Sequence, residues 1–265
     1  MLHMILLPLL AIVGGAAGFH LRCWELSSAF DSEGLPITGA PATVALILLS
    51  VILAAVFLLF CLRSRNKTSP LGEAFLCPGN RAYLAFCMVA AALLLAAAVT
   101  GLMAEFAAWS PNYPSVLLWV LCIPSGACVV LAGIRNFRTV SRPRSLTLLI
   151  PAFTCCVWLV VACQSFTANP ITLDYVYQLF AVLCTLIGIY FTASMSFVRT
   201  RIWPHMLFSL LGLYFSIITL ADRHNTPFVL LFLFAILYQL IHITVLLRRM
   251  FPLKKKKPFG GHSHE

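Results

Sequence analysis

The chain contains eight stretches of at least 20 residues that hold no Asp, Glu, Lys or Arg. An α-helix rises about 1.5 Å per residue, so about 20 apolar residues are needed to cross the hydrocarbon core of a bilayer. The charge-free stretches therefore predict a polytopic membrane protein. They are 1–21, 34–62, 82–104, 106–134, 145–173, 175–198, 202–221 and 224–247.

The composition indicates a single membrane domain and no separate soluble domain. Hydrophobic residues make up 61% of the 265 residues and charged residues 10%, whereas a soluble domain carries about 25% charged residues. We expect an all-α bundle of eight transmembrane helices over 1–250, followed by a basic, disordered tail over 251–265. The expected helices are 2–20, 41–62, 83–104, 115–134, 146–166, 176–198, 203–221 and 226–247.

The basic residues are concentrated in alternate connections between the expected helices. Of the 18 Lys and Arg residues, all except Arg22 and Arg223 fall in alternate connections or in the tail, which must share one side of the membrane. The positive-inside rule predicts that this side is cytoplasmic, so both termini are expected inside. Because the net charge of +10 is distributed in this way, it argues against a nucleic-acid partner.

A run of four lysines in the tail is expected to contact anionic lipid headgroups on the cytoplasmic side. A solvated tail that only stops translocation is the alternative. These residues are Lys254, Lys255, Lys256 and Lys257.

The first charge-free stretch also has to be weighed as a signal peptide. It lacks the basic region that such a peptide needs, and its apolar stretch is long, so we expect it to be retained as the first helix. Small residues at 14–18 could form a cleavage zone, and cleavage would leave seven spans.

Neutral polar residues within the spans are candidates for lining a solute site. The fourth span carries a central proline, which removes a backbone hydrogen bond and predicts a kink or a cavity lining. In the eighth span, Tyr238 and Gln239 lie four and three residues before His242, so all three can share one face. Hydrogen bonding between packed helices is the alternative role. The candidate lining residues are Pro124, Ser125, Gly126, Gln164, Tyr190, Tyr238, Gln239 and His242.

The first outer connection, over 22–40, is a candidate surface for recognising a partner. Arg22 and Glu25 are three residues apart, so a helical turn would bring their charges together. An ordered cap over the bundle is the alternative. The candidate recognition residues are Arg22, Trp24, Glu25, Asp31 and Glu33.

This same segment resembles uncharacterised multi-pass membrane proteins of clostridial-type bacteria. The resemblance rests on Trp24-Glu25-Leu26, Phe30-Asp31, Gly34-Leu35-Pro36 and Pro41-Ala42-Thr43, within the region 22–43. It implies a bacterial plasma membrane and no particular activity.

Missing motifs shape the functional expectation. No expected helix carries a carboxylate, Lys or Arg near mid-bilayer, so ion coupling through a carboxylate is not expected. Nucleophile-elbow, zinc-protease and Walker motifs are absent from the sequence, and we expect no metal or cofactor. The leading hypothesis is a non-enzymatic protein that binds or passes a small neutral or weakly polar solute. The alternative is an accessory, scaffold or sensor protein that meets an unidentified membrane partner through 22–40 or through the basic inner face.

Overall fold

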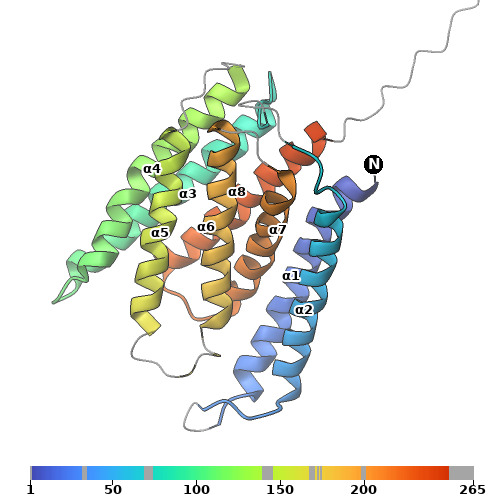
Figure 1. The fold of residues 1–265 in the computed structure, drawn as a ribbon. Coiled ribbons are helices and arrows are strands. Elements are labelled where there is room, and N and C mark those ends of the chain that lie inside the picture. Colours follow the sequence, from blue (N-terminus) through green and yellow to red (C-terminus); the bar gives the residue numbers. More distant parts are fainter. Residues whose placement is uncertain are drawn as a thin grey trace, which may run out of the picture.

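The structure is a computed structural model that describes residues 2–31, 35–68, 74–138, 146–166, 171, 173, 175–197 and 201–250. Within these residues the chain forms eight long helices, each long and apolar enough to cross a membrane. The expected all-α, multi-pass membrane fold is confirmed (Figure 1). The helices are α1 (Leu2–Ser28), α2 (Pro41–Leu62), α3 (Arg81–Ala107), α4 (Tyr113–Arg138), α5 (Leu146–Phe166), α6 (Val176–Phe197), α7 (Ile202–Ile218) and α8 (Thr226–Met250).

Several helices extend beyond their charge-free stretches. The largest correction concerns α1, which ends at Ser28 and not at residue 20, so 22–28 belongs to a helix and not to a loop. Apolarity locates the part of a helix that lies in lipid, whereas backbone hydrogen bonding continues into polar flanks. By contrast, α7 ends at Ile218 and is followed by a short 3₁₀ turn, Thr219–Ala221.

Local sequence explains where two of the helices begin. Pro41 occupies the first turn of α2, where a missing backbone N–H leaves no hydrogen bond unmade. Asn80 caps α3, because its side-chain oxygen accepts a hydrogen bond from the backbone N–H of Tyr83 at 3.2 Å.

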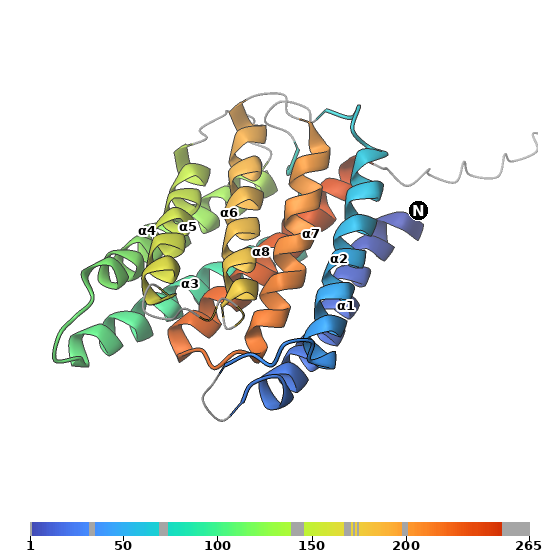
Figure 2. The same cartoon turned by 60° about the horizontal axis from the view of Figure 1, so that its bottom comes forward.

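The centre of the bundle is formed by α7 and α8. In their spans 67% and 61% of the residues are buried, compared with 22% for α2, which therefore lies at the periphery. The α1–α2 hairpin packs on α7, while α3 packs on α8 and on α4. Helix α6 lies between α5 and α7, so the hairpins α1–α2 and α3–α4 flank the centre on opposite sides (Figures 1 and 2).

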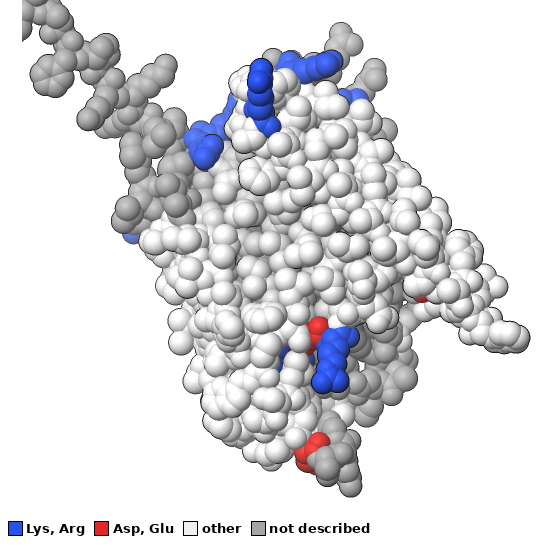
Figure 3. Space-filling view, turned by 180° about the vertical axis from the view of Figure 1, so that it is seen from behind, with Lys and Arg blue, Asp and Glu red and all other residues white. Residues whose placement is uncertain are grey.

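The connections that carry basic residues meet at one end of the bundle, which we call the basic end. The backbone N–H of Cys77 donates to Asn136 O at 2.9 Å, and that of Ile202 donates to Lys67 O at 3.2 Å. The α2–α3 connection therefore contacts both the end of α4 and the start of α7. Figure 3 shows most of the coloured Lys and Arg side chains at this end, and acidic side chains with a basic one beside them towards the other.

The end of α1 and the α5–α6 and α7–α8 connections meet at the opposite end. The guanidinium of Arg22, near the end of α1, donates to Leu173 O at 3.1 Å and pairs with Asp222, which follows α7. Alternate connections thus share an end, as the distribution of charge predicts.

Candidate functional site

A line of buried polar and small residues runs between α6, α7 and α8. On α7 its members recur at alternating spacings of four and three residues, which places them on one face of the helix. From His205 to Thr219 this face extends about 21 Å. We call the line the polar seam. It consists of Gln178, Thr185, Gly188 and Thr192 on α6, His205, Ser209, Gly212 and Ser216 on α7, Thr219 in the turn that follows α7, and Gln239 and His242 on α8, all buried.

Two glycines bring the three helices together at the middle of the polar seam. A Cβ atom added to Gly188 would lie 2.6 Å from the side-chain nitrogen of Gln239, so only glycine leaves room for that amide. A Cβ atom at Gly212 would lie 3.2 Å from the backbone nitrogen of Thr185. Such small residues allow helices to approach closely in lipid, where there is no hydrophobic drive for association.

Several hydrogen-bonding atoms along the polar seam have no partner among the described residues. The Gln239 Nε2 donates to Thr185 O at 3.2 Å, but Gln239 Oε1 has no partner among the described residues. The same is true of Thr185 Oγ1, His205 Nε2 and Ser216 Oγ. Because an unpaired polar atom costs free energy in an apolar interior, these atoms favour a bound water or another small hydrogen-bonding molecule.

At the basic end, an aromatic ring covers two histidines of the polar seam. The Phe75 ring lies edge-on to both His205 and His242, with ring centroids 5.6 Å and 5.1 Å away. The Nδ1 atom of His205 lies 3.2 Å from Gly188 O, and that of His242 lies 2.8 Å from Tyr238 O. Phe75 is itself buried, so it closes this end of the polar seam.

At the opposite end, the polar seam meets a network of charges. Arg22 pairs with Glu25 and with Asp222, each at 2.7 Å, and its guanidinium lies 5.1 Å from the centre of the Tyr177 ring. Thr219, the last residue of the polar seam, donates to the second oxygen of Asp222 at 2.8 Å. We call Arg22, Glu25, Asp222 and His224 the charge network.

His224 completes the charge network just outside the membrane-spanning part of α8. Its Nε2 atom lies 3.0 Å from the Thr219 hydroxyl and 4.0 Å from the Asp222 carboxylate. Burial lowers the pKa of His224, and the nearby Arg22 charge lowers it further. The Asp222 carboxylate and the hydrogen bond at Thr219 act in the opposite direction without overcoming the effect of burial.

The charge network corrects one expectation from the sequence. The predicted contact between Arg22 and Glu25 is confirmed, but both side chains are 0% exposed and therefore unavailable to a partner protein. They are buried because α1 continues as a helix and carries them against α6 and the α7–α8 connection. Trp24 is 47% exposed and Asp31 is exposed, so these two remain open to solvent or lipid. Glu33 lies outside the described residues, as do Lys254 to Lys257 and the rest of the tail.

The candidate residues of the fourth span do not form one site. Helix α4 continues through Pro124, which faces outwards, whereas Ser125 points to α5 and hydrogen-bonds the Thr154 hydroxyl at 2.6 Å. Gly126 faces α3, where an added Cβ would lie 3.4 Å from Ala91 O. Gln164 is exposed near the end of α5.

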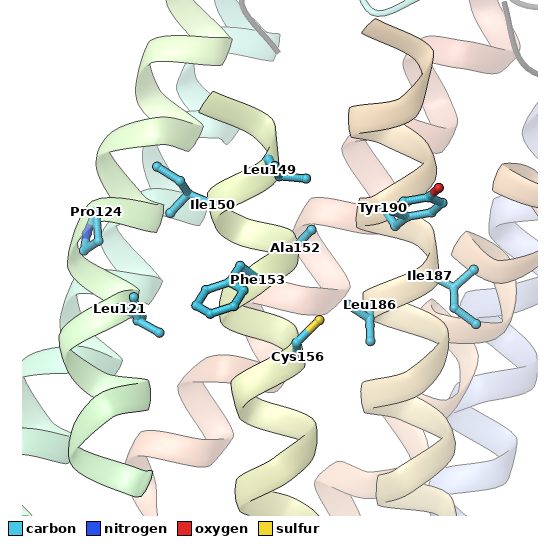
Figure 4. A pocket seen from close by; sticks show the side chains of 10 residues that line it. All are labelled: Leu121, Pro124, Leu149, Ile150, Ala152, Phe153, Cys156, Leu186, Ile187 and Tyr190. Carbon is cyan, nitrogen blue, oxygen red and sulfur yellow. The ribbon is translucent and has the colours of Figure 1, made fainter. Parts of the chain in front are cut away.

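Pro124 and Tyr190 instead line a cavity of about 910 Å³ on the outer surface of α4, α5 and α6. Figure 4 shows Pro124 and Leu121 on one side of α5 and Tyr190 on the other. The lining is almost entirely apolar and includes neither Gln239 nor His242. The structure therefore separates this cavity from the polar seam.

Sequence reasoning found part of the polar seam. Gln239 and His242 belong to it, and Tyr238 stacks on His242 with ring centroids 3.9 Å apart. It missed His205 and Phe75. An ionisable side chain within an apolar span is a signal for His205, whereas nothing in the local sequence distinguishes Phe75.

The fold defines a multi-pass helical membrane protein, and the polar seam is a line of buried polar residues within its otherwise apolar core. No three His, Cys, Asp or Glu side chains gather as metal ligands in the part of the chain that the structure describes. No protein-family model, curated protein or solved structure matches the chain.

Proposed function

We propose that this protein binds a small, neutral, hydrogen-bonding solute in the polar seam and passes it between the two ends of the bundle. The supporting observation is the set of unpaired polar atoms on Thr185, His205, Ser216 and Gln239. A molecule with one or two donors and acceptors would supply the missing partners. A neutral solute suits the site because the segments 175–198, 202–221 and 224–247, which contain every residue of the polar seam, carry no Asp, Glu, Lys or Arg.

Because both ends of the polar seam are covered, we favour passage by alternating access rather than through an open pore. Phe75 covers the polar seam at the basic end and the charge network covers it at the opposite end. A transporter with a central site opens one end at a time. Phe75 is the natural element to move, since it lies between the two histidines and the basic end and belongs to the α2–α3 connection.

We also propose that the protein lies in a bacterial plasma membrane with its basic end and both termini in the cytoplasm. The meeting of the basic connections at one end supports this orientation through the positive-inside rule.

Ligand-dependent thermal stabilisation in detergent tests the proposed binding. The probes are urea, acetamide, formamide and glycerol. Each probe is added to the native chain and to the variants Gln239→Leu and Gln164→Leu. Gln164→Leu is the matched control, because Gln164 is exposed and lies outside the polar seam. A molecule that binds only the folded state raises the melting temperature. We expect at least one probe to stabilise the native chain and Gln164→Leu, with loss of that shift in Gln239→Leu. Equal shifts in all three chains, or none in any, would contradict binding in the polar seam.

A second candidate function, recognition of a membrane partner, has support at the opposite end. Leu35 and Ile37 are each 48% exposed in a connection held in place by the bond from Ile37 N–H to Ala29 O at 2.7 Å. Large exposed apolar side chains on an ordered segment are typical of a contact surface. The double variant Leu35→Ser/Ile37→Ser should lose a partner captured by cross-linking in cells while its melting temperature is unchanged. Retention of every cross-link would contradict this candidate.

A further inference from the structure

Two of the unpaired atoms in the polar seam can only accept a hydrogen bond, and the first is Oε1 of Gln239. The orientation of this amide is fixed by Thr185 O, which lies 3.2 Å from Nε2. Because a carbonyl oxygen cannot donate, the nitrogen and the oxygen of the amide cannot be exchanged. Oε1 is therefore the atom without a partner among the described residues.

The second acceptor is Nε2 of His205. Its Nδ1 atom lies 3.2 Å from Gly188 O, where two acceptors would repel each other, so Nδ1 carries the proton. The His205 side chain is 0% exposed and forms no ion pair within the described part of the chain, so the ring is neutral. In a neutral ring with a protonated Nδ1, Nε2 can only accept, and it too has no partner among the described residues.

Both acceptors belong to side chains that contact Gly188. Gly188 O is the atom beside His205, and a Cβ atom added to Gly188 would lie 2.9 Å from Oε1 of Gln239. The other unpaired atoms of the polar seam are the hydroxyls of Thr185 and Ser216. A hydroxyl donates as well as accepts, so these two and the second N–H of Gln239 can serve an acceptor on a ligand.

We infer that the solute of the polar seam is an unsubstituted amide, either a primary carboxamide or a urea, whose two N–H donors bind Gln239 Oε1 and His205 Nε2. This inference rests on the proposed function and specifies its substrate class. The carbonyl oxygen of such a solute accepts from the hydroxyl of Thr185 or Ser216, whereas a polyol brings a further acceptor with every donor. A buried acceptor left unpaired costs free energy, so a solute without the two donors binds more weakly.

Three isomeric amides, which contain the same atoms, test the inference at constant size. Propionamide has two N–H donors, N-methylacetamide has one and N,N-dimethylformamide has none, while each has one carbonyl acceptor. Titration of the melting temperature in detergent gives their affinities for the native chain. We expect the affinity to fall about tenfold with each donor removed.

The variant His205→Phe separates hydrogen bonding from shape. It removes the Nε2 acceptor and keeps an aromatic ring, while Gly188 O retains its hydrogen bond from the Thr192 hydroxyl at 3.0 Å. Propionamide and N-methylacetamide should then bind equally, because the second donor has lost its acceptor, whereas a steric effect of the N-methyl group would persist. His20→Phe, a change at an exposed histidine, is the matched control and should keep the tenfold preference.

The outcomes distinguish this inference from the proposed function. Equal affinities of the native chain for the three isomers, with the effect abolished in Gln239→Leu, would overturn the inference and leave the proposed function intact. Stabilisation by glycerol without any by urea, acetamide or propionamide would do the same. A tenfold preference that persists in His205→Phe would also overturn it. No effect of any probe would contradict both. If His205→Phe does not fold, the isomer series on the native chain still decides.

Discussion

The Nε atom of Arg22 lies 2.7 Å from Oδ1 of Asp222, and this ion pair joins α1 to the α7–α8 connection across 200 residues of sequence. The same guanidinium holds Glu25 at 2.7 Å, so one cation is shared between two carboxylates at the end of the polar seam. A buried charge is tolerated only when it is paired, which makes the two carboxylates depend on Arg22.

Arg22→Met should therefore destabilise the bundle strongly. It leaves Glu25, whose side chain is 0% exposed, without its partner, and breaking a buried pair in this way costs about 3–5 kcal/mol. Thermal unfolding in detergent measures the effect. The control Arg223→Met removes an exposed arginine from the same end and should change the free energy of unfolding by about 0.5 kcal/mol or less. Adding Glu25→Gln to Arg22→Met should recover part of the loss; if Arg22→Met unfolds like the control, the ion pair does not stabilise the fold.

Stability should fall as the pH is lowered through the range in which histidine titrates. Burial lowers the pKa of His224 in the folded state, whereas in the unfolded chain the pKa is about 6.5. Below that value the unfolded state binds a proton that the folded state does not, so the free energy of unfolding decreases. Melting temperatures at pH 7.5 and 5.5 should differ less for His224→Asn than for the native chain. His20→Asn, which changes an exposed histidine, should keep the native difference.

Two glycines at the interface between α3 and α4 should differ in how much their replacement by alanine destabilises the protein. A Cβ at Gly101 would lie 2.7 Å from Cγ of the buried Trp119 indole, so Gly101→Ala should cost about 1–3 kcal/mol through overpacking. At Gly126 the nearest atoms would lie 3.4 Å away, so Gly126→Ala should be nearly neutral. Chemical unfolding of both variants is the measurement, and equal stability of the two would show that α3 and α4 do not pack as described.

The reactivity of the Cys77 thiol should report the positive charge of Arg248 and Arg249 at the basic end. Burial raises the pKa of Cys77, and the positive charges of Arg249 and Arg248 partly offset that rise. Arg249→Gln should therefore raise the pKa further and slow alkylation by iodoacetamide at pH 8, since the thiolate is the reactive form. Mass spectrometry can follow Cys77 against the exposed Cys23 as an internal reference. Arg65→Gln should leave the rate unchanged, and an equal slowing there would contradict a local effect.

The transmembrane helices could be predicted because one physical quantity, the length of charge-free sequence, determines them. The end of α1 could not be predicted in this way, because Arg22 and Glu25 look like loop residues until Arg22 is seen to pair with both Glu25 and the distant Asp222.

The candidate site was harder to predict for a geometric reason. Pro124, Ser125 and Gly126 are consecutive, and consecutive residues on a helix point about 100° apart, so they could not line one cavity. The regular spacing from His205 to Thr219 is visible in the sequence, but only packing shows that this face of α7 meets Thr185 and Gln239.

Stopped-flow measurement of urea and glycerol entry into proteoliposomes tests the proposed function most directly. Phe75→Ala removes the ring that covers His205 and His242, so it should increase the rate several-fold over protein-free liposomes. Adding Gln239→Leu should return the rate to that of protein-free liposomes, whereas adding Gln164→Leu should not. Rates for Phe75→Ala that equal those of protein-free liposomes for both solutes would contradict passage through the polar seam.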